Sequence, residues 1–167
     1  QMLYDSKLGI DLTNKSEGEP GYGKQVPPHA HPPVFPKQEA VIEAFPEVKA
    51  VAEIQNSILL VALNKTLPNQ GKQFIQSFFD HPKFSTVEIV IVLEGHVDLT
   101  NISIVMWKFL NNIDPKRDFY FRDERLGIDA TQKFPEEGYQ QNWPKEIEMT
   151  SDIKTKVDNN WGNLFKG

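Results

Sequence analysis

Hydrophobic positions along the chain alternate between runs typical of strands and spacings typical of helices. Continuous apolar runs at Ile58–Leu63 and 87–92 predict buried strands, and the half-polar run Val48–Ile54 predicts an antiparallel partner for the first. A shorter run at 118–121 predicts a further strand. Between these runs, apolar residues at helical spacing predict helices after Pro36, after Pro68 and over 101–112. The order predicts an α/β fold with three layers, a mixed, mainly parallel sheet and helices on both faces.

The predicted helices differ in how their apolar residues are distributed. After Pro68, one face carries four large apolar residues: Phe74, Ile75, Phe78 and Phe79. Over 101–112, apolar residues occupy most of the circumference, which predicts a helix that is covered nearly all round: Ile102, Val105, Met106, Trp107, Phe109 and Leu110. Ile153, Val157 and Trp161 at a spacing of four predict a last helix, opened by Ser151 and Asp152.

Proline and glycine dominate the beginning of the chain. Six prolines and three glycines between residues 16 and 36 forbid a helix or a central strand there. We therefore expect a proline-rich extended arm over residues 1–36 and one α/β domain over residues 37–167. A chain of 167 residues is long enough to bury one core without disulfides or metals.

Composition excludes several classes of function. The chain has no cysteine, which removes thiol catalysis and cysteine-based metal sites. Its net charge is −5 with scattered basic residues, so nucleic acid is not an expected partner. It lacks eighteen consecutive apolar residues and a signal-peptide pattern, which predicts a cytoplasmic protein without a transmembrane segment. Because it opens on Gln1, we interpret it as part of a longer protein.

A short motif occurs twice. Residues 8–15 (LGIDLTNK) and 126–133 (LGIDATQK) agree at six of eight positions, including Asp11 and Lys15 in the first copy. The second copy contains Asp129, Thr131 and Lys133. One interpretation is a pair of similar turns in which Asp and Thr side chains bond nearby backbone amides. The other is a motif that docks on equivalent surfaces, within one chain or between two protomers.

Three polar side chains follow the strand at 87–92, where open α/β sheets place ligands. Glu94, His96 and Asp98 alternate along an extended segment and could serve as general acid and base or hold a cation. The alternative is a solvated turn in which Asp98 or Asn101 caps the next helix.

Other polar groups give weaker signals. His29 and His31 could supply two metal ligands, but no third ligand lies nearby in the sequence, so surface packing or partner docking is the alternative. Lys65 and Lys72 flank a predicted helix start and could cradle an anion, without the glycine spacing of a phosphate loop. Arg117 and Asp118 are expected to form an ordinary ion pair.

A family resemblance rests on motifs spread over 45–161. Val97-Asp98, Val105-Met106-Trp107, Asp114-Pro115-Lys116-Arg117-Asp118 and Gly127 to Lys133 match, in order, segments of the carboxy-terminal domain of UbiD-type decarboxylases. The chain resembles that domain, although Gly95 and His96 replace acidic residues of the family's triplet. The motif-bearing candidate positions for a structural or interface role are therefore Asp11, Lys15, Asp98, Trp107, Asp129, Thr131, Lys133 and Trp161.

The resemblance implies a role inside a larger enzyme. UbiD-type enzymes are reversible decarboxylases of aromatic or α,β-unsaturated acids that use prenylated FMN and a divalent metal, several of them in ubiquinone or menaquinone biosynthesis. Their catalytic and cofactor residues lie in a preceding flavin-binding domain, and none carries over to this chain. The implied role is support and assembly of a homodimer or higher homo-oligomer, with Trp161, Leu164 and Phe165 at the interface. The alternatives are a stand-alone small-molecule or anion-binding α/β module, and a hydrolase using Glu94, His96 and Asp98.

Overall fold

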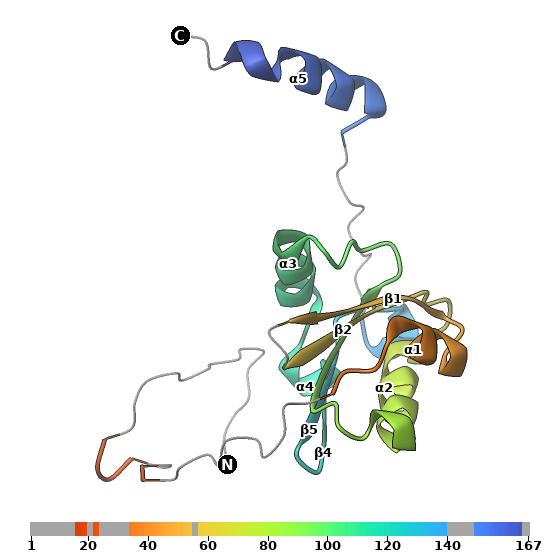
Figure 1. Cartoon of the computed structure of the whole chain (residues 1–167), viewed down its shortest axis with the longest axis vertical. Coiled ribbons are helices and arrows are strands. Elements are labelled where there is room, and N and C mark those ends of the chain that lie inside the picture. The colour runs from red at the N-terminus through yellow and green to blue at the C-terminus, as the bar shows by residue number, and fades with distance from the viewer. Residues whose placement is uncertain (1–15, 20–21, 24–33, 55–56, 140–148, 165–167) are drawn as a thin grey trace.

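The structure, a computed structural model, describes residues 16–19, 22–23, 34–54, 57–139 and 149–164. Its elements are α1 (Gln38–Ala44), β1 (Val48–Ile54), β2 (Ile58–Leu63), α2 (Gln70–Asp80), η1 (Pro82–Phe84), β3 (Ile89–Glu94), α3 (Ile102–Asn112), α4 (Pro115–Asp118), β4 (Phe119–Arg122), β5 (Arg125–Asp129), η2 (Pro135–Glu137) and α5 (Ser151–Leu164). The strands form one sheet in the order β1-β2-β3-β5-β4 (Figure 1). Its central pairings, β2 with β3 and β3 with β5, are parallel, and both outer pairings are antiparallel.

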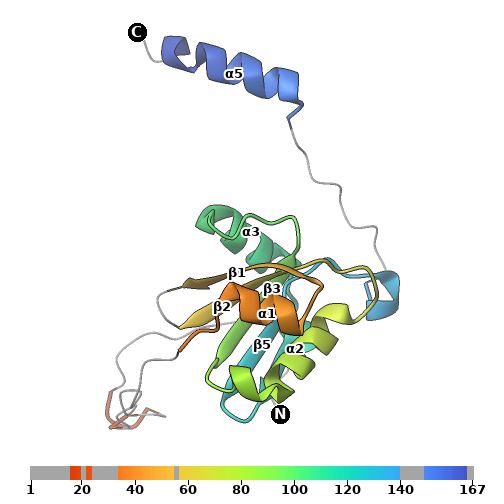
Figure 2. The same ribbon diagram turned by 45° about the vertical axis from the view of Figure 1, so that its right-hand side comes forward.

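Helices cover both faces of this sheet, which confirms the predicted three-layer α/β fold (Figure 2). The first face packs against α1 and α2 through Val41, Phe45, Phe74, Ile75, Phe78 and Phe79. The second face packs against α3 and the loop before it through Leu60, Ala62, Ile91, Leu93, Val97, Leu99 and Val105. Because β2 and β3 contribute to both clusters, their continuous apolar sequences are explained by burial on both sides.

The carboxyl-terminal hairpin adds a strand that the sequence analysis does not predict. The run at 118–121 does form a strand, β4, but β4 is an antiparallel edge strand. The third parallel strand is β5, whose residues 126–129 are the first half of the motif at 126–133. Asp123, with a φ of 54°, takes part in the reversal between the two strands. A tight hairpin thus inserts β5 beside β3 and leaves β4 at the edge.

α3 departs most from the sequence prediction. The expectation that it is covered nearly all round is wrong, because Trp107 is 53% and Leu110 63% exposed. Ile102 and Met106 are exposed as well, whereas Val105 is buried. Among the described residues, the sheet and the preceding loop contact one side of this helix, so its remaining apolar residues face outward.

Two contacts fix the hairpin against the rest of the fold. A side chain at Gly127 would overlap Ile75, so α2 lies directly on β5. The guanidinium of Arg125 donates hydrogen bonds to the carbonyl oxygens of Phe79, Phe84 and Val87 at 2.9, 2.8 and 2.8 Å. Arg125 thereby joins the start of β5 to the end of α2 and to the approach to β3.

The two ends of the chain are described only in part. The predicted last helix is confirmed as α5, in which Ile153 and Trp161 are exposed. Most of the predicted arm, including His29 and His31, lies outside the described residues, so the division at residue 36 stays a prediction. Within the described ranges, no helix combines the length and apolar character needed to cross a membrane.

Candidate functional site

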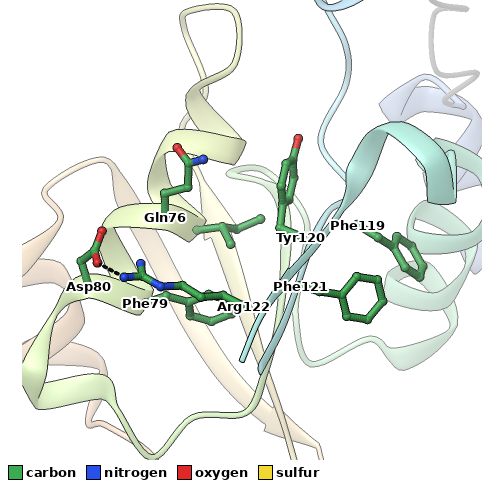
Figure 3. A pocket seen from close by; sticks show the side chains of 8 residues that line it. Gln76, Phe79, Asp80, Phe119, Tyr120, Phe121 and Arg122 are labelled. Atoms are coloured by element: carbon green, nitrogen blue, oxygen red, sulfur yellow. Dashed lines mark ion pairs between the residues drawn. The ribbon is translucent and has the colours of Figure 1, made fainter. Parts of the chain in front are cut away.

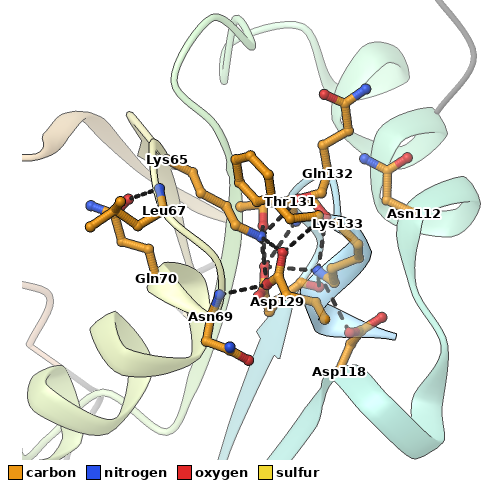
Figure 4. A network of polar contacts seen from close by, with 12 residues as sticks. Lys65, Leu67, Asn69, Gln70, Asn112, Asp118, Asp129, Thr131, Gln132 and Lys133 are labelled. Atoms are coloured by element: carbon orange, nitrogen blue, oxygen red, sulfur yellow. Dashed lines mark hydrogen bonds and ion pairs between the residues drawn. The ribbon is translucent and has the colours of Figure 1, made fainter. Parts of the chain in front are cut away.

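The candidate site lies where the parallel strands end. β2, β3 and β5 run in the same direction, so their carboxyl ends share one edge of the sheet, the usual ligand position in open α/β folds. Lys65 follows β2, Glu94 ends β3 and Asp129 ends β5. Thr131 and Lys133 follow Asp129, and Figure 4 shows the side chains of Lys65, Asp129, Thr131 and Lys133 converging. The sheet thus gathers charged groups that are far apart in the sequence.

Lys133 is at the centre of this cluster, and its side chain is only 2% exposed. Its ammonium group donates to the carbonyl oxygens of Asp129 and Thr131 at 2.7 and 2.8 Å. The same nitrogen lies 3.0 Å from Asp129 Oδ1 and 3.6 Å from Asp118 Oδ1. A buried ammonium needs such partners, since desolvation without them is costly.

Asp118 contributes the second buried carboxylate, with 1% exposure of its side chain. The Arg117 guanidinium donates to both of its oxygens at 2.8 Å, and the backbone N–H of Asp114 donates at 2.7 Å. The hydrogen bonds to this carboxylate raise the pKa of Arg117. The expected pair of Arg117 and Asp118 therefore exists, but it is part of a buried cluster rather than an ordinary surface pair.

A second ion pair adjoins the first. Lys65 Nζ lies 2.7 Å from both carboxylate oxygens of Glu137 and donates to Thr131 Oγ1 at 3.1 Å. Glu137 also accepts hydrogen bonds from the backbone N–H groups of Asn69 and Phe134, at 2.9 and 2.7 Å. Lys72 instead lies over the ring of Tyr120, 5.2 Å from its centre. Lys65 and Lys72 therefore do not form the predicted anion cradle.

Asp129 and Thr131 show the backbone bonding that the turn interpretation predicts. Asp129 Oδ1 accepts a hydrogen bond from the backbone N–H of Thr131 at 3.0 Å, and another from its hydroxyl. A side chain at Gly71 would overlap the Asp129 carboxylate, so the start of α2 closes over it. The first copy of the motif, with Asp11 and Lys15, lies outside the described residues. Its docking role stays a prediction.

Glu94 is the third buried acid, with 8% exposure. Its Oε1 accepts hydrogen bonds from Asn112 Nδ2 at 3.2 Å and from the backbone N–H of Gln132 at 3.0 Å. Its Oε2 is buried without a hydrogen-bond partner among the described residues. Glu94 and His96 line a small pocket of about 220 Å³ between the ends of β2 and β3.

Asp98 does not join Glu94 and His96. It lies outside that pocket, and its carboxylate accepts hydrogen bonds from the hydroxyl and the backbone N–H of Thr100 at 2.7 and 2.9 Å. These bonds lower the pKa of Asp98. Asn101 caps α3 by accepting from the backbone N–H of Ile104 at 3.3 Å. The structure thus supports the capping interpretation. Within the described ranges, no three His, Asp or Glu side chains are placed to share a metal ion.

A larger groove of about 510 Å³ lies between α2 and β4. In Figure 3, Arg122 reaches toward α2 and pairs with Asp80, whereas Phe119 and Phe121 point the other way. Tyr120 donates its hydroxyl to the carbonyl oxygen of Arg117 at 3.1 Å. Burial, with the nearby charges of Asp129 and Asp118, raises the pKa of Tyr120 to about 12.

The remaining motif positions lie apart from this site. Trp107 is exposed on α3 and Trp161 is exposed on α5. Sequence reasoning missed Glu137, because nothing in its local sequence distinguishes it from a surface acid. The sequence predicts anion binding for Lys65, whereas its carboxylate partner, Glu137, lies 72 positions further on. Both belong to the same network as the motif residues.

The fold and site define a class: a three-layer α/β domain in which an internal ionic network occupies the edge where the parallel strands end. The sequence model of the 3-octaprenyl-4-hydroxybenzoate carboxy-lyase C-terminal domain matches residues 33–139. The chain belongs to this family, as the motifs predicted.

Similar proteins agree with this assignment. An uncharacterized protein of Archaeoglobus fulgidus is 28% identical over 126 residues, which cover 65% of this chain and 26% of that protein. An uncharacterized protein of Aquifex aeolicus is 26% identical over 125 residues, with the same coverage. The chain therefore spans about a quarter of the length of these relatives.

Solved structures share the fold. The vanillic acid decarboxylase of Sedimentibacter hydroxybenzoicus in closed form matches with a TM-score of 0.58 and 20% identity, over 78% of this chain and 31% of that one. An evolved dimeric form of the UbiD-class enzyme HmfF from Pelotomaculum thermopropionicum, in complex with prFMN, has the same score and identity over 72% and 27%. At this identity the likeness concerns the fold.

Proposed function

We propose that this chain is the carboxy-terminal domain of a UbiD-type carboxy-lyase and that it supports and assembles the enzyme. The carrying observation is the family match over 33–139, the part of the chain in which Asp118, Asp129, Thr131 and Lys133 meet in one buried network. An internally paired network of this kind rigidifies the sheet edge. Such an edge suits a support better than a reaction centre, whose acids and bases must exchange protons.

The proposal extends to the longer enzyme of which this chain would form the last domain. We place prenylated FMN and a divalent metal in a preceding flavin-binding domain, and take aromatic or unsaturated acids as substrates. Ubiquinone or menaquinone biosynthesis is the proposed pathway, in the cytoplasm, with the enzyme working as a homodimer or higher homo-oligomer. Residues 1–36 would form the arm that leads into the domain at 37–167.

The described residues do not fit a flavin. The pocket beside Glu94, at about 220 Å³, is smaller than the roughly 300–1,000 Å³ of typical ligand sites. Lys65, which lines it, is paired with Glu137, and Arg122 in the larger groove is paired with Asp80. A flavin phosphate would have to break one of these pairs to gain a cation. No step of a flavin reaction is therefore assigned to these residues.

The test compares this chain with the longer natural gene product that contains it. Each is purified, supplied with prenylated FMN and Mn²⁺, and assayed for CO₂ release from a panel of hydroxybenzoic and cinnamic acids. We expect release from the longer protein and none from the chain alone. Release by the chain alone would contradict the support role, and no release by the longer protein on any acid would contradict the enzyme assignment.

One observation favours a second candidate, a stand-alone small-molecule-binding module. The buried Oε2 of Glu94 lacks a partner among the described residues and adjoins a pocket, as expected of a carboxylate that receives a donor from a ligand. Thermal unfolding with phosphates, flavins, amines and aromatic acids tests this. A stabilisation that Glu94→Gln abolishes would support the module, and no shift with any compound would reject it.

A further inference from the structure

The motif that occurs twice belongs to a longer repeat in the sequence. Aligned without a gap, residues 2–15 (MLYDSKLGIDLTNK) and 120–133 (YFRDERLGIDATQK) agree at seven of fourteen positions. Asp5 falls on Asp123, the residue in the hairpin turn. After a difference of one residue in spacing, residues 21–22 (GY) fall on 138–139 (GY), and the proline at 27 falls on the one at 144. The repeat therefore includes the equivalents of β4, the hairpin turn, β5 and the segment after it.

The positions that agree are those that the fold constrains in the second copy. Gly127 has no room for a side chain beside Ile75, and Asp123 adopts a positive φ of 54° in the turn. Gln132 is exposed and is Asn in the first copy, whereas the buried Ala130 is replaced by another apolar residue, Leu. A repeat that follows burial in this way indicates a shared fold. Four further repeated positions are buried: Ile128, Asp129, Thr131 and Lys133.

The turn after the motif has the same hydrogen bonds in both copies. In the second copy, the backbone N–H of Phe134 donates to Glu137 Oε2 at 2.7 Å, and the N–H of Glu137 donates to the carbonyl oxygen of Phe134 at 2.9 Å. In the first copy, the N–H of Ser16 donates to Glu19 Oε2 at 2.6 Å, and the N–H of Glu19 donates to the carbonyl oxygen of Ser16 at 3.1 Å. Glu19 thus has the position of Glu137, the carboxylate that binds Lys65.

Among the described residues, the partners that this motif needs are already engaged by the second copy. β5 lies between β3 and β4 and pairs with both. The carboxylate of Asp118 is paired with Lys133, and the ammonium of Lys65 is paired with Glu137. The first copy therefore needs a second set of partners for the same four side chains: Asp11, Thr13, Lys15 and Glu19.

We propose that residues 2–27 are the end of a preceding α/β domain of the same fold, and that Asp11, Thr13, Lys15 and Glu19 belong to its own buried network. A segment that docked on another molecule would need only the equivalent of β5, whereas the repeat also includes the equivalents of β4 and the turn. Residues 28–33 then connect two domains, and Val34 joins the second one by accepting a hydrogen bond from the Thr86 hydroxyl at 3.0 Å. This inference refines the support role proposed above, because the arm becomes the end of one support domain and a proline-rich connector to the next.

The natural gene sequence gives the first test. The roughly 100 residues ahead of Gln1, the usual size of a small domain, should contain two continuous apolar runs in the places of β2 and β3. A lysine should follow the first run, as Lys65 follows β2, because Glu19 needs a cation. An arginine and an acid should follow the second run, in the places of Arg117 and Asp118, because Lys15 needs a carboxylate. A preceding sequence without this order would overturn the proposal.

Amide hydrogen exchange compares the longer natural protein with the 167-residue chain. The amides of Gly9 and Ile10 should be protected at least a hundredfold more in the longer protein, because only that protein contains their strand partners. The amides of Gly127 and Ile128 are the matched control and should be protected alike in both proteins. Equal protection of Gly9 and Ile10 in the two proteins would refute the preceding domain.

Single substitutions then locate the network of each copy. Lys15→Met should lower a thermal transition of the longer protein by about 10 °C or more and leave the transition of the 167-residue chain unchanged. Lys133→Met should lower a transition in both proteins, and Lys24→Met, outside the repeated positions, should shift neither. A shift caused by Lys15→Met in the chain would place the first copy on the described domain and refute the proposal. CO₂ release judges the enzyme assignment separately, since a longer protein that decarboxylates but ignores Lys15→Met loses only the second domain.

Discussion

Replacing Lys133 by Met should destabilise the domain severely. The Lys133 side chain is 2% exposed, and its ammonium contacts two carbonyl oxygens and the carboxylates of Asp129 and Asp118. Met fills a similar volume but donates no hydrogen bond, so four buried oxygens lose a partner. Removing one member of a buried ionic cluster costs about 3–5 kcal/mol, and domains have about 5–15 kcal/mol in total. We therefore expect a fifth or more of the unfolding free energy to disappear.

Urea unfolding followed by circular dichroism measures this loss. Lys49→Met, on the exposed face of β1, is the matched control and should change the free energy by less than about 0.5 kcal/mol. The double variant Lys133→Met with Asp118→Asn should lose less than the sum of the single losses, because Asn carries no unpaired charge. A Lys133→Met protein within about 1 kcal/mol of the native chain would refute the network's stabilising role.

Three further predictions concern single sites. The pKa of Tyr120 rises from 10.0 to about 12 on folding, so its contribution to stability is complete below pH 10 and is lost as the pH rises through 12. The melting temperature of Tyr120→Phe should therefore fall less between pH 10 and 12 than that of the native chain. Parallel pH dependence of the two melting temperatures would contradict this. Gly127→Ala forces a methyl group into Ile75 and should cost about 1–3 kcal/mol in urea unfolding, and an unchanged midpoint would show that α2 can move away. Asn101→Ala removes the cap that accepts from Ile104 and should cost about 1 kcal/mol, whereas no change would show that the cap is dispensable.

Much of the sheet is predictable because its local patterns agree with its tertiary environment. The apolar runs that form β2 and β3 are buried on both faces, and the amphipathic face of α2 packs on the sheet as its spacing predicts. The hairpin of β1 and β2 follows from a half-polar run next to an apolar one. In these elements local sequence and burial favour the same structure.

The rest depends on contacts between distant residues. β5 begins with Arg125 and ends with Asp129, and such charged ends give little local indication of a strand inside a sheet. The pair of Lys65 and Glu137 likewise has no local signature. α3 carries an apolar composition that predicts burial, but Trp107 and Leu110 are each more than half exposed. Its sequence indicates an apolar helix and does not indicate which surface covers it.

The three hydrogen bonds of Arg125 make local opening of the sheet a concerted event. If the hairpin separated from β3, the carbonyl oxygens of Phe79, Phe84 and Val87 would lose their hydrogen bonds together, because one guanidinium donates to all three. The end of α2, the η1 turn and the hairpin should therefore fluctuate as a single foldon with a common opening free energy. Opening of the hairpin alone is correspondingly rare, which keeps β5 in register beside β3.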